Sequence, residues 1–224
     1  MTSPAAAATA EDTLDPVRID ALVESLAADG LAVACDLLPA DLVAALRQSA
    51  MLHEAAGELA PAGLGRGAGR AHETAIRQAD ARWIDDADAS ERRFLAVAET
   101  LRTAINRRLF LGLFDFEAQH LSYPPGGFYA RHLDSLAGTR NRVVSLVLYL
   151  NEDWREEHGG QLVIWRRNED GAPAAEVLPE AGTLVLFLSE EIPHEVRPAT
   201  RTRRAIAGWF RVNPSTSRRV DPAG

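Results

Sequence analysis

Two side chains of metal-binding type lie two residues apart in the segment RHLD, at His132 and Asp134. In a β-strand, residues i and i+2 point to the same face, so both side chains would lie on one side of a sheet. A neutral imidazole and a carboxylate on one face can supply two of the three ligands that non-haem iron(II) takes, which leaves positions for oxygen and a cosubstrate. We therefore take His132 and Asp134 as candidate metal ligands.

The third ligand must come from a distant part of the chain, and His194 is the candidate. It lies in the segment IPHEV, directly after the apolar pattern TLVLFLS and its acidic turn, and the residues that follow it predict another strand. Four other histidines fall in a helix, in loops or ahead of a turn, and we expect them to be solvated or capping residues: His53, His72, His120 and His158. The sequence thus predicts a His–Asp–His metal site.

Shortly after the third histidine, the segment RRAIAGWFR begins with a pair of arginines. Strand alternation would place Arg203 on one face with Ala205 and Ala207, leaving room in front of its guanidinium for a small dicarboxylate. A slip of one residue would exchange the two faces, so Arg204 is the alternative. Tyr149, at the end of the strand pattern RVVSLVLYL, could donate a hydrogen bond to the same carboxylate.

The elements that must position these residues begin with helices. Apolar residues recur at helical spacing over residues 17–28, 39–56 and 90–109. Between the first two helices, the segment LAVACDLL predicts a short buried strand. Residues 61–70, PAGLGRGAGR, hold four glycines without a strand–helix frame around them, which favours a mobile loop over a phosphate-binding site.

From residue 114 the pattern changes to period two, with short apolar runs separated by Gly and Pro turns. This pattern predicts strands near residues 115–123, 128–134, 142–150, 161–166, 175–178, 183–188, 194–197 and 203–211. Short strands at regular spacing are typical of a jelly-roll barrel. We expect an α+β protein with a double-stranded β-helix core, which is a cupin-like jelly roll, and with N-terminal helices packed on its outside.

A chain of 224 residues is long enough for one domain with a core of its own. We expect a disordered leader at residues 1–16 and a C-terminal tail at 214–224. Between them, a single domain at 17–213 would consist of helical support at 17–110 and the double-stranded β-helix at 114–213.

The composition excludes several classes of function. The formal net charge of −8 disfavours binding to nucleic acid or to an anionic membrane, and no apolar run approaches the roughly 18 residues of a membrane span. Every basic residue is Arg, so the chain has no Lys for P-loop phosphate binding or Schiff-base chemistry. Cys35 is the single cysteine, which excludes an internal disulfide and favours a reducing compartment. We expect a cytoplasmic monomer.

Five segments, in order and spacing, resemble the prolyl 4-hydroxylase group of iron(II)- and 2-oxoglutarate-dependent dioxygenases, above all the bacterial relatives of the hypoxia-inducible-factor prolyl hydroxylases. The resemblance covers roughly residues 72–211 and rests on YPPGGFYARHLD, RVVSLVLYLNEDW, HGGQLVIW, LPEAGTLVLFLSEEIPHEV and TRRAIAGWF. It implies Fe(2+), 2-oxoglutarate and O2, with ascorbate as a reductant. It also implies hydroxylation of a prolyl residue in a protein substrate, with a translation factor as one candidate.

Two other functions are compatible with parts of the sequence. The chain could hydroxylate a free amino acid or another small metabolite with the same fold and metal. An alternative of another class is a non-catalytic β-barrel binding module, against which the retention of all the site residues argues.

The resemblance also implies roles for individual residues. It makes His132, Asp134 and His194 the iron ligands, and Arg203 the anchor of the 2-oxoglutarate carboxylate with Tyr149 hydrogen-bonded to the same group. It places four residues at the border of the target prolyl residue: Tyr123, Tyr129, Arg142 and Arg77. The segment IRQADARW (76–83), which contains Arg77, becomes part of a flexible loop that closes over the substrate.

Overall fold

The computed structural model describes residues 14–63, 76–135, 141–166 and 171–213. Most of the predicted leader, the C-terminal tail and most of the glycine-rich loop lie outside these residues. Leu14 is buried and Asp15 caps the first helix, so the fold begins ahead of the expected boundary at residue 17. Within the described ranges, no helix is both long and apolar enough to cross a lipid bilayer.

Three helices form where the periodicity predicts them: α1 (Pro16–Asp29), α2 (Ala40–Ala55) and α3 (Ala89–Leu109). Local capping defines their ends. At the start of α3, the Asp88 side chain accepts hydrogen bonds from the backbone N–H groups of Ser90 and Glu91. Helix α1 ends at Gly30, whose φ of 67° is the left-handed conformation that glycine adopts without strain.

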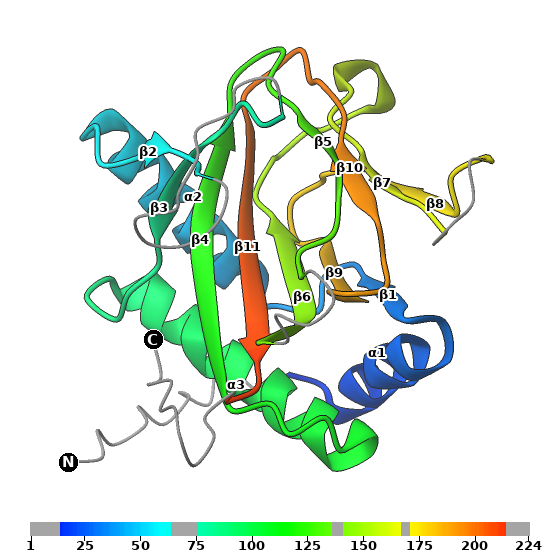
Figure 1. Ribbon diagram of the computed structural model, residues 1–224. Coiled ribbons are helices and arrows are strands. Elements are labelled where there is room, and N and C mark those ends of the chain that lie inside the picture. Colours follow the sequence, from blue (N-terminus) through cyan, green and yellow to red (C-terminus); the bar gives the residue numbers. More distant parts are fainter. Residues whose placement is uncertain (1–13, 64–75, 136–140, 167–170, 214–224) are drawn as a thin grey trace, which may run out of the picture.

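Seven antiparallel strands form the major sheet, in the order β1-β9-β6-β11-β4-β3-β2 (Figure 1). Strand β11 lies at its centre and pairs with β4 over its whole length and with β6 over most of it. The strands of this sheet are β1 (Leu31–Ala34), β2 (Ala60–Pro61), β3 (Asp80–Trp83), β4 (Asp115–Tyr123), β6 (Arg142–Tyr149), β9 (Leu184–Leu188) and β11 (Arg203–Arg211).

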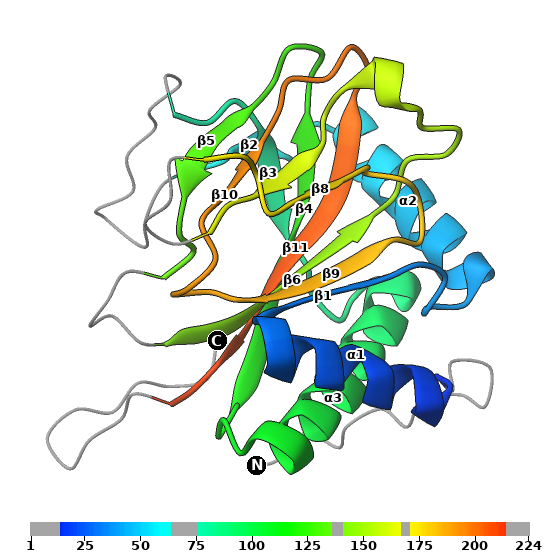
Figure 2. The ribbon, with the colours of Figure 1, turned by 90° about the vertical axis from the view of Figure 1, so that its right-hand side faces the viewer.

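Four short strands form the minor sheet, in the order β5-β10-β7-β8. They are β5 (Tyr129–His132), β7 (Leu162–Ile164), β8 (Ala175–Val177) and β10 (His194–Val196). Figure 2 shows the minor sheet on the side of the major sheet away from the helices. The two sheets are the double-stranded β-helix that the sequence predicts, and the eight strands predicted after residue 114 are all confirmed.

The two faces of the major sheet are covered differently. On the face that packs against α1, α2 and α3, which we call the helix face, side chains such as Phe94 and Ile206 form the larger apolar core. The opposite face, which we call the pocket face, packs against the minor sheet through residues such as Phe187 and Val196. Because side chains alternate along each strand, neighbouring residues of β4, β6 and β11 belong to opposite faces.

Two segments differ from the predictions. Residues 76–83 were expected in a flexible loop, but β3 pairs with β4 from Asp80 opposite Ser122 to Trp83 opposite Gln119. The segment DARW alternates polar and apolar residues over only four positions, a short strand signal that the loop prediction passed over, and it covers the backbone groups that β4 would otherwise leave unpaired at a sheet edge. The strand predicted in LAVACDLL is β1, which ends at residue 34 and, as an edge strand, leaves Val33 exposed.

Candidate active site

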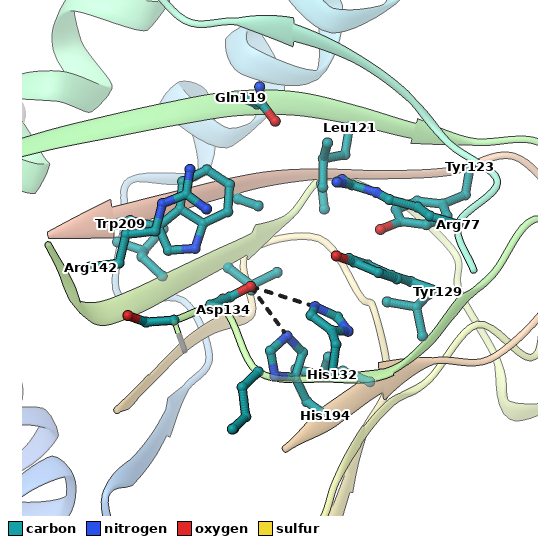
Figure 3. Close-up of a pocket in the computed structure, with 18 of the residues that line it drawn as sticks. Arg77, Gln119, Leu121, Tyr123, Tyr129, His132, Asp134, Arg142, His194 and Trp209 are labelled. Atoms are coloured by element: carbon teal, nitrogen blue, oxygen red, sulfur yellow. Dashed lines mark ion pairs between the residues drawn. The ribbon is translucent and has the colours of Figure 1, made fainter. Parts of the chain in front are cut away.

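The three candidate ligands come together at one end of the minor sheet. His132 ends β5, His194 begins β10, and the two residues lie opposite each other in the strand register. Asp134 lies in the bend just past β5, and because the strand ends at His132, two residues earlier, the strand alternation assumed from the sequence does not reach it. Its Oδ1 still lies 3.5 Å from Nε2 of His132 and 3.8 Å from Nε2 of His194 (Figure 3).

These atoms suit a metal ion. One nitrogen of each histidine and one carboxylate oxygen lie within 4.8 Å of one another, and this is the set of nitrogen and oxygen donors that non-haem iron(II) prefers. Nδ1 of His132 lies 2.8 Å from the backbone oxygen of Ala130, and Nδ1 of His194 lies 3.1 Å from that of Ile192. Since a carbonyl oxygen only accepts, each Nδ1 carries the proton, and each Nε2 keeps a lone pair directed at the site.

The electrostatics favour the protonation states that metal binding needs. Burial raises the pKa of the Asp134 carboxyl, but His194, His132 and the Ser145 hydroxyl together hold it well below its usual range. Burial lowers the pKa of the His194 imidazole to about 4, against the opposing effect of Asp134. At neutral pH the site therefore presents a carboxylate beside a neutral imidazole.

A second polar centre lies deeper between the sheets, at Arg203 and Tyr149. Arg203 is only 1% exposed, and its Nε donates to the backbone oxygen of Gly160 at 2.8 Å. Its guanidinium lies 5.0 Å from the ring centroid of Tyr149 and 5.1 Å from that of Tyr123. Among the residues that the structure describes, no carboxylate pairs with Arg203.

The Tyr149 hydroxyl is buried and has no hydrogen-bond partner within the described part of the chain. Burial raises the pKa of this hydroxyl to about 12, with Arg203 opposing the shift, so the group stays protonated and able to donate. A buried cation without a counter-ion and a buried donor without an acceptor are each costly. Together they fit one carboxylate of a small dicarboxylate such as 2-oxoglutarate.

The choice between the two arginines follows from their surroundings. Arg204 points to the helix face, where its Nε and Nη2 contact the Glu54 carboxylate at 2.9 and 2.7 Å. That ion pair leaves Arg204 no role in the pocket. Arg203 lines the pocket together with Ala205 and Ala207, as the strand alternation predicted.

The metal triad and Arg203 line one cavity of about 700 Å³ between the two sheets, and Tyr149 lies buried behind its wall beside Arg203. Three of the residues predicted to contact substrate lie on the mouth side of the metal triad. Tyr129 stacks on the His132 ring with centroids 3.5 Å apart, and the Arg77 guanidinium lies 4.7 Å above the Tyr129 ring. Arg142 lies 3.6 Å above the Trp209 ring and forms an ion pair with Glu117 at 2.8 Å.

Tyr123 differs from these three residues. It also lines the cavity, but it is 1% exposed and lies beneath Arg203, near the expected position of the 2-oxoglutarate carboxylate. Its place in the fold is therefore less suited to contact with a prolyl target than that of Tyr129.

Sequence reasoning missed several residues that line the pocket or support it. The buried Gln119 amide lies across the pocket from the triad and makes no hydrogen bond to any described residue (Figure 3). Trp83 and Trp209 form an edge-to-face pair at the mouth, with centroids 6.5 Å apart. Ser145 donates to Asp134. Gln119 and Ser145 lie on the pocket face by strand alternation alone, so that signal could have found them.

The remaining histidines serve other purposes. His53 contacts Glu58 at 2.6 Å, and His158 accepts from the backbone N–H of Arg155. The expectation that His120 is solvated or capping is wrong: it is buried in β4 on the helix face, with Nε2 3.1 Å from the Glu91 carboxylate. The expectation for His72 lies outside the described residues.

The fold, the His–Asp–His triad and the neighbouring Arg203 and Tyr149 together define a class of protein. The chain belongs to the 2OG-Fe(II) oxygenase superfamily, whose sequence pattern matches residues 118–211. Members of this superfamily use Fe(2+), 2-oxoglutarate and O2, and the donor set and the unpaired Arg203 and Tyr149 fit these groups. The chain thus belongs to a family of 2-oxoglutarate-dependent oxygenases.

Individual relatives refine this placement. The solved structure of a Pseudomonas putida prolyl-4-hydroxylase is 45% identical, covers 87% of this chain and 98% of its own, and superposes with a TM-score of 0.78. A prolyl hydroxylase from Trichoplax adhaerens, solved with a hypoxia-inducible-factor peptide fragment, is 25% identical over 87% of this chain and 89% of its own, with a TM-score of 0.73. Human Egl nine homolog 1 is 41% identical over 91 residues, which are 39% of this chain and 21% of that relative. The match thus spans about a fifth of the length of this curated relative.

Proposed function

We propose that this chain hydroxylates a prolyl residue in a protein substrate and converts 2-oxoglutarate and O2 to succinate and CO2. The observation that carries the proposal is one cavity with two complementary poles. A metal-binding triad lies at one pole, and at the other lie the buried Arg203 and Tyr149, which have no carboxylate partner among the described residues. Similarity to prolyl hydroxylases, one of them solved with a peptide, supports a prolyl substrate.

At the first pole, His132, Asp134 and His194 would hold the iron. Their donor atoms approach from one side, which leaves the other coordination positions for small ligands. The carbonyl oxygens of Ala130 and Ile192 keep both imidazoles in one tautomer and orientation. When bound, iron(II) with 2-oxoglutarate would activate O2, so that one oxygen atom of O2 enters the target C–H bond and the other enters succinate.

At the second pole, the guanidinium of Arg203 would bind one carboxylate of 2-oxoglutarate, with the Tyr149 hydroxyl donating to the same group. Both side chains are already held in place before the cosubstrate enters, Arg203 by Gly160 and Tyr149 by its burial. Preorganised donors of this kind lose little entropy on binding and select an anionic, planar group.

At the mouth, aromatic and arginine side chains would contact the substrate. Tyr129, Trp83 and Trp209 offer flat apolar surfaces to a prolyl ring and limit the access of water. Among the residues that the structure describes, none hydrogen-bonds the Gln119 side chain, so its amide offers a peptide group both a donor and an acceptor. Bound substrate would therefore satisfy polar atoms that the described residues leave without partners.

The test compares two treatments of a lysate from the cells that contain this protein. One receives the wild-type chain with iron(II), 2-oxoglutarate and air, and the other receives the same mixture with Asp134→Ala. Mass spectrometry then searches for peptides that gain one oxygen atom, and succinate is measured in parallel. We expect a prolyl peptide to be oxidised only by wild type, because Asp134→Ala removes one of three metal ligands.

The other outcomes identify the alternatives. Succinate without an oxidised peptide would replace the protein substrate by a free amino acid or another small metabolite. Neither product, from a wild-type chain that is folded and binds metal, would contradict the proposal and favour a binding module.

A further inference from the structure

The two oxygens of the Asp134 carboxylate have different surroundings. Oδ1 faces the Nε2 atoms of both histidines, as described above. Oδ2 points the other way and accepts a hydrogen bond of 2.6 Å from the hydroxyl of Ser145, a residue of β6 that is 1% exposed. The carboxylate is thus held in one rotational orientation, with a single oxygen directed at the site.

Ser145 is itself supported by a second buried serine. The hydroxyl of Ser189, which follows β9 and has no exposed surface, lies 2.9 Å from the hydroxyl of Ser145. A serine hydroxyl has one hydrogen to donate. Because Ser145 donates its hydrogen to Asp134, Ser189 must donate to Ser145, and the hydrogen bonds run in one direction from Ser189 to Ser145 to Asp134.

The backbone of Ser189 holds the same region from the other side. Its carbonyl oxygen accepts a hydrogen bond from the N–H of Ser135, the residue after Asp134, at 3.2 Å. Its own N–H donates to the carbonyl oxygen of Val143 in β6 at 3.0 Å. Ser189 therefore ties the bend that carries Asp134 to the rigid major sheet through its backbone and its side chain.

We propose that Ser189 and Ser145 form a directional hydrogen-bond relay that positions Asp134, so that the carboxylate offers the metal only one oxygen. This inference rests on the proposed function. Both serines are positioning residues, because neither hydroxyl faces the metal site. Without the relay, Asp134 can rotate and present both oxygens, which would occupy a position that a cosubstrate needs. Loss of such supporting hydrogen bonds typically lowers metal affinity by about 10- to 100-fold.

The relay makes graded predictions for substitutions. Ser145→Ala removes the donor to Asp134, and we expect Mn(II) affinity to fall by about 10-fold or more. Ser189→Ala leaves Ser145 able to donate, so we expect a smaller fall. Ser145→Thr keeps a hydroxyl at the same place and should restore most of the affinity. Ser49→Ala is the matched control, because Ser49 is also buried but lies in α2 on the far side of the major sheet.

The experiment uses the full chain stripped of metal with a chelator. Isothermal titration with Mn(II) measures affinity, and the visible absorption of the Co(II)-loaded protein reports the ligand arrangement without any turnover. We expect Ser145→Ala to change the Co(II) spectrum and Ser49→Ala to leave it as in wild type. Circular dichroism confirms that each variant is folded.

Three results would decide the matter. Wild-type Mn(II) affinity and an unchanged Co(II) spectrum in Ser145→Ala would overturn the relay. If Ser145→Ala fails to fold, Ser189→Ala decides in its place, and wild-type behaviour in both readouts would overturn the proposal. A wild-type chain that binds neither metal would instead contradict the proposed function, so the two failures are distinguishable.

Discussion

The two arginines that begin β11 lie on opposite faces of the major sheet and have opposite surroundings. On the helix face, Arg204 is paired with Glu54, and the fully buried Glu91 accepts hydrogen bonds from Arg82 at 2.8 Å and from the Asp85 N–H at 2.9 Å. On the pocket face, Arg203 has no carboxylate partner among the described residues. Adjacent residues of one strand therefore differ completely in how their charge is neutralised.

This difference separates structural from ligand-binding polar groups. A buried polar group costs free energy unless it is satisfied. For Arg204 and Glu91 that cost is offset within the protein, whereas for Arg203 and the Tyr149 hydroxyl it remains, among the described residues, until a ligand enters. Unsatisfied polar atoms of the pocket face, including the Tyr149 hydroxyl, thus mark where external groups bind.

The largest effect is expected when the two arginines are compared directly. Arg203→Leu should raise the KM for 2-oxoglutarate by about 100-fold or more, because the buried ion pair to the cosubstrate is lost. Arg204→Leu should leave this KM unchanged and lower the free energy of unfolding by about 2 kcal/mol, because Glu54 loses its partner. Steady-state kinetics of succinate formation and urea unfolding measure the two quantities. Equal effects of both variants on the KM would remove the distinction between the faces.

A second prediction concerns Glu91 on the helix face. Burial raises the pKa of the Glu91 carboxyl, but hydrogen bonds from His120, the Asp85 N–H and Arg82 hold it below its usual value of 4.5. Glu91→Gln should lower the free energy of unfolding by about 2 to 4 kcal/mol at pH 7 without changing the KM for 2-oxoglutarate.

The pH dependence of this loss has a defined sign. A carboxyl whose pKa is lower in the folded state stabilises the fold at pH values above 4.5, and this contribution is lost as the pH falls. The stability difference between wild type and Glu91→Gln should therefore shrink below pH 4.5. A difference that stays constant through the acid range would show that Glu91 is not stabilised as a charged group.

The smallest effect is expected for Tyr149→Phe on the pocket face. Removal of an unpaired buried hydroxyl should leave stability at pH 7 unchanged or slightly raised, while the KM for 2-oxoglutarate rises about 10-fold. The pKa of Tyr149, about 12 when folded, exceeds its ordinary value of 10, so between pH 10 and pH 12 the unfolded state loses this proton more readily and the free energy of unfolding falls. Unfolding measured across this range should show a steeper loss for wild type than for the variant. A marked loss of stability at pH 7 would instead mean that the hydroxyl has a partner within the protein.

Much of the fold could be predicted because it depends on local alternation. The period-two pattern after residue 114 predicted the strands, whereas the pattern in β11 left Arg203 and Arg204 as alternatives, between which only the family resemblance chose. His132 and His194 could be proposed because their residue type is informative and few histidines compete. These inferences needed no knowledge of which strands pair.

The parts that could not be predicted depend on contacts between distant segments. Strand β3 has only a four-residue alternation of its own, and its pairing with β4 is not indicated by that segment. His120 is buried because Glu91, 29 residues earlier, accepts its hydrogen bond. The Ser145–Ser189 contact joins residues 44 apart, and serine is too common a residue to signal it. Contacts between residues so far apart in the sequence depend on how the sheet assembles, so the periodicity within one segment does not indicate them.

The tryptophan pair at the mouth gives the protein an optical property of its own. The indoles of Trp83 and Trp209 lie edge to face at 6.5 Å and both line the pocket, and none of the four tryptophans lies in a helix. Coupled indole transitions produce near-ultraviolet circular dichroism, and indole emission responds to nearby ligands and to paramagnetic ions. Occupancy of the pocket should therefore be visible in unlabelled protein, as a change in ellipticity and in fluorescence intensity.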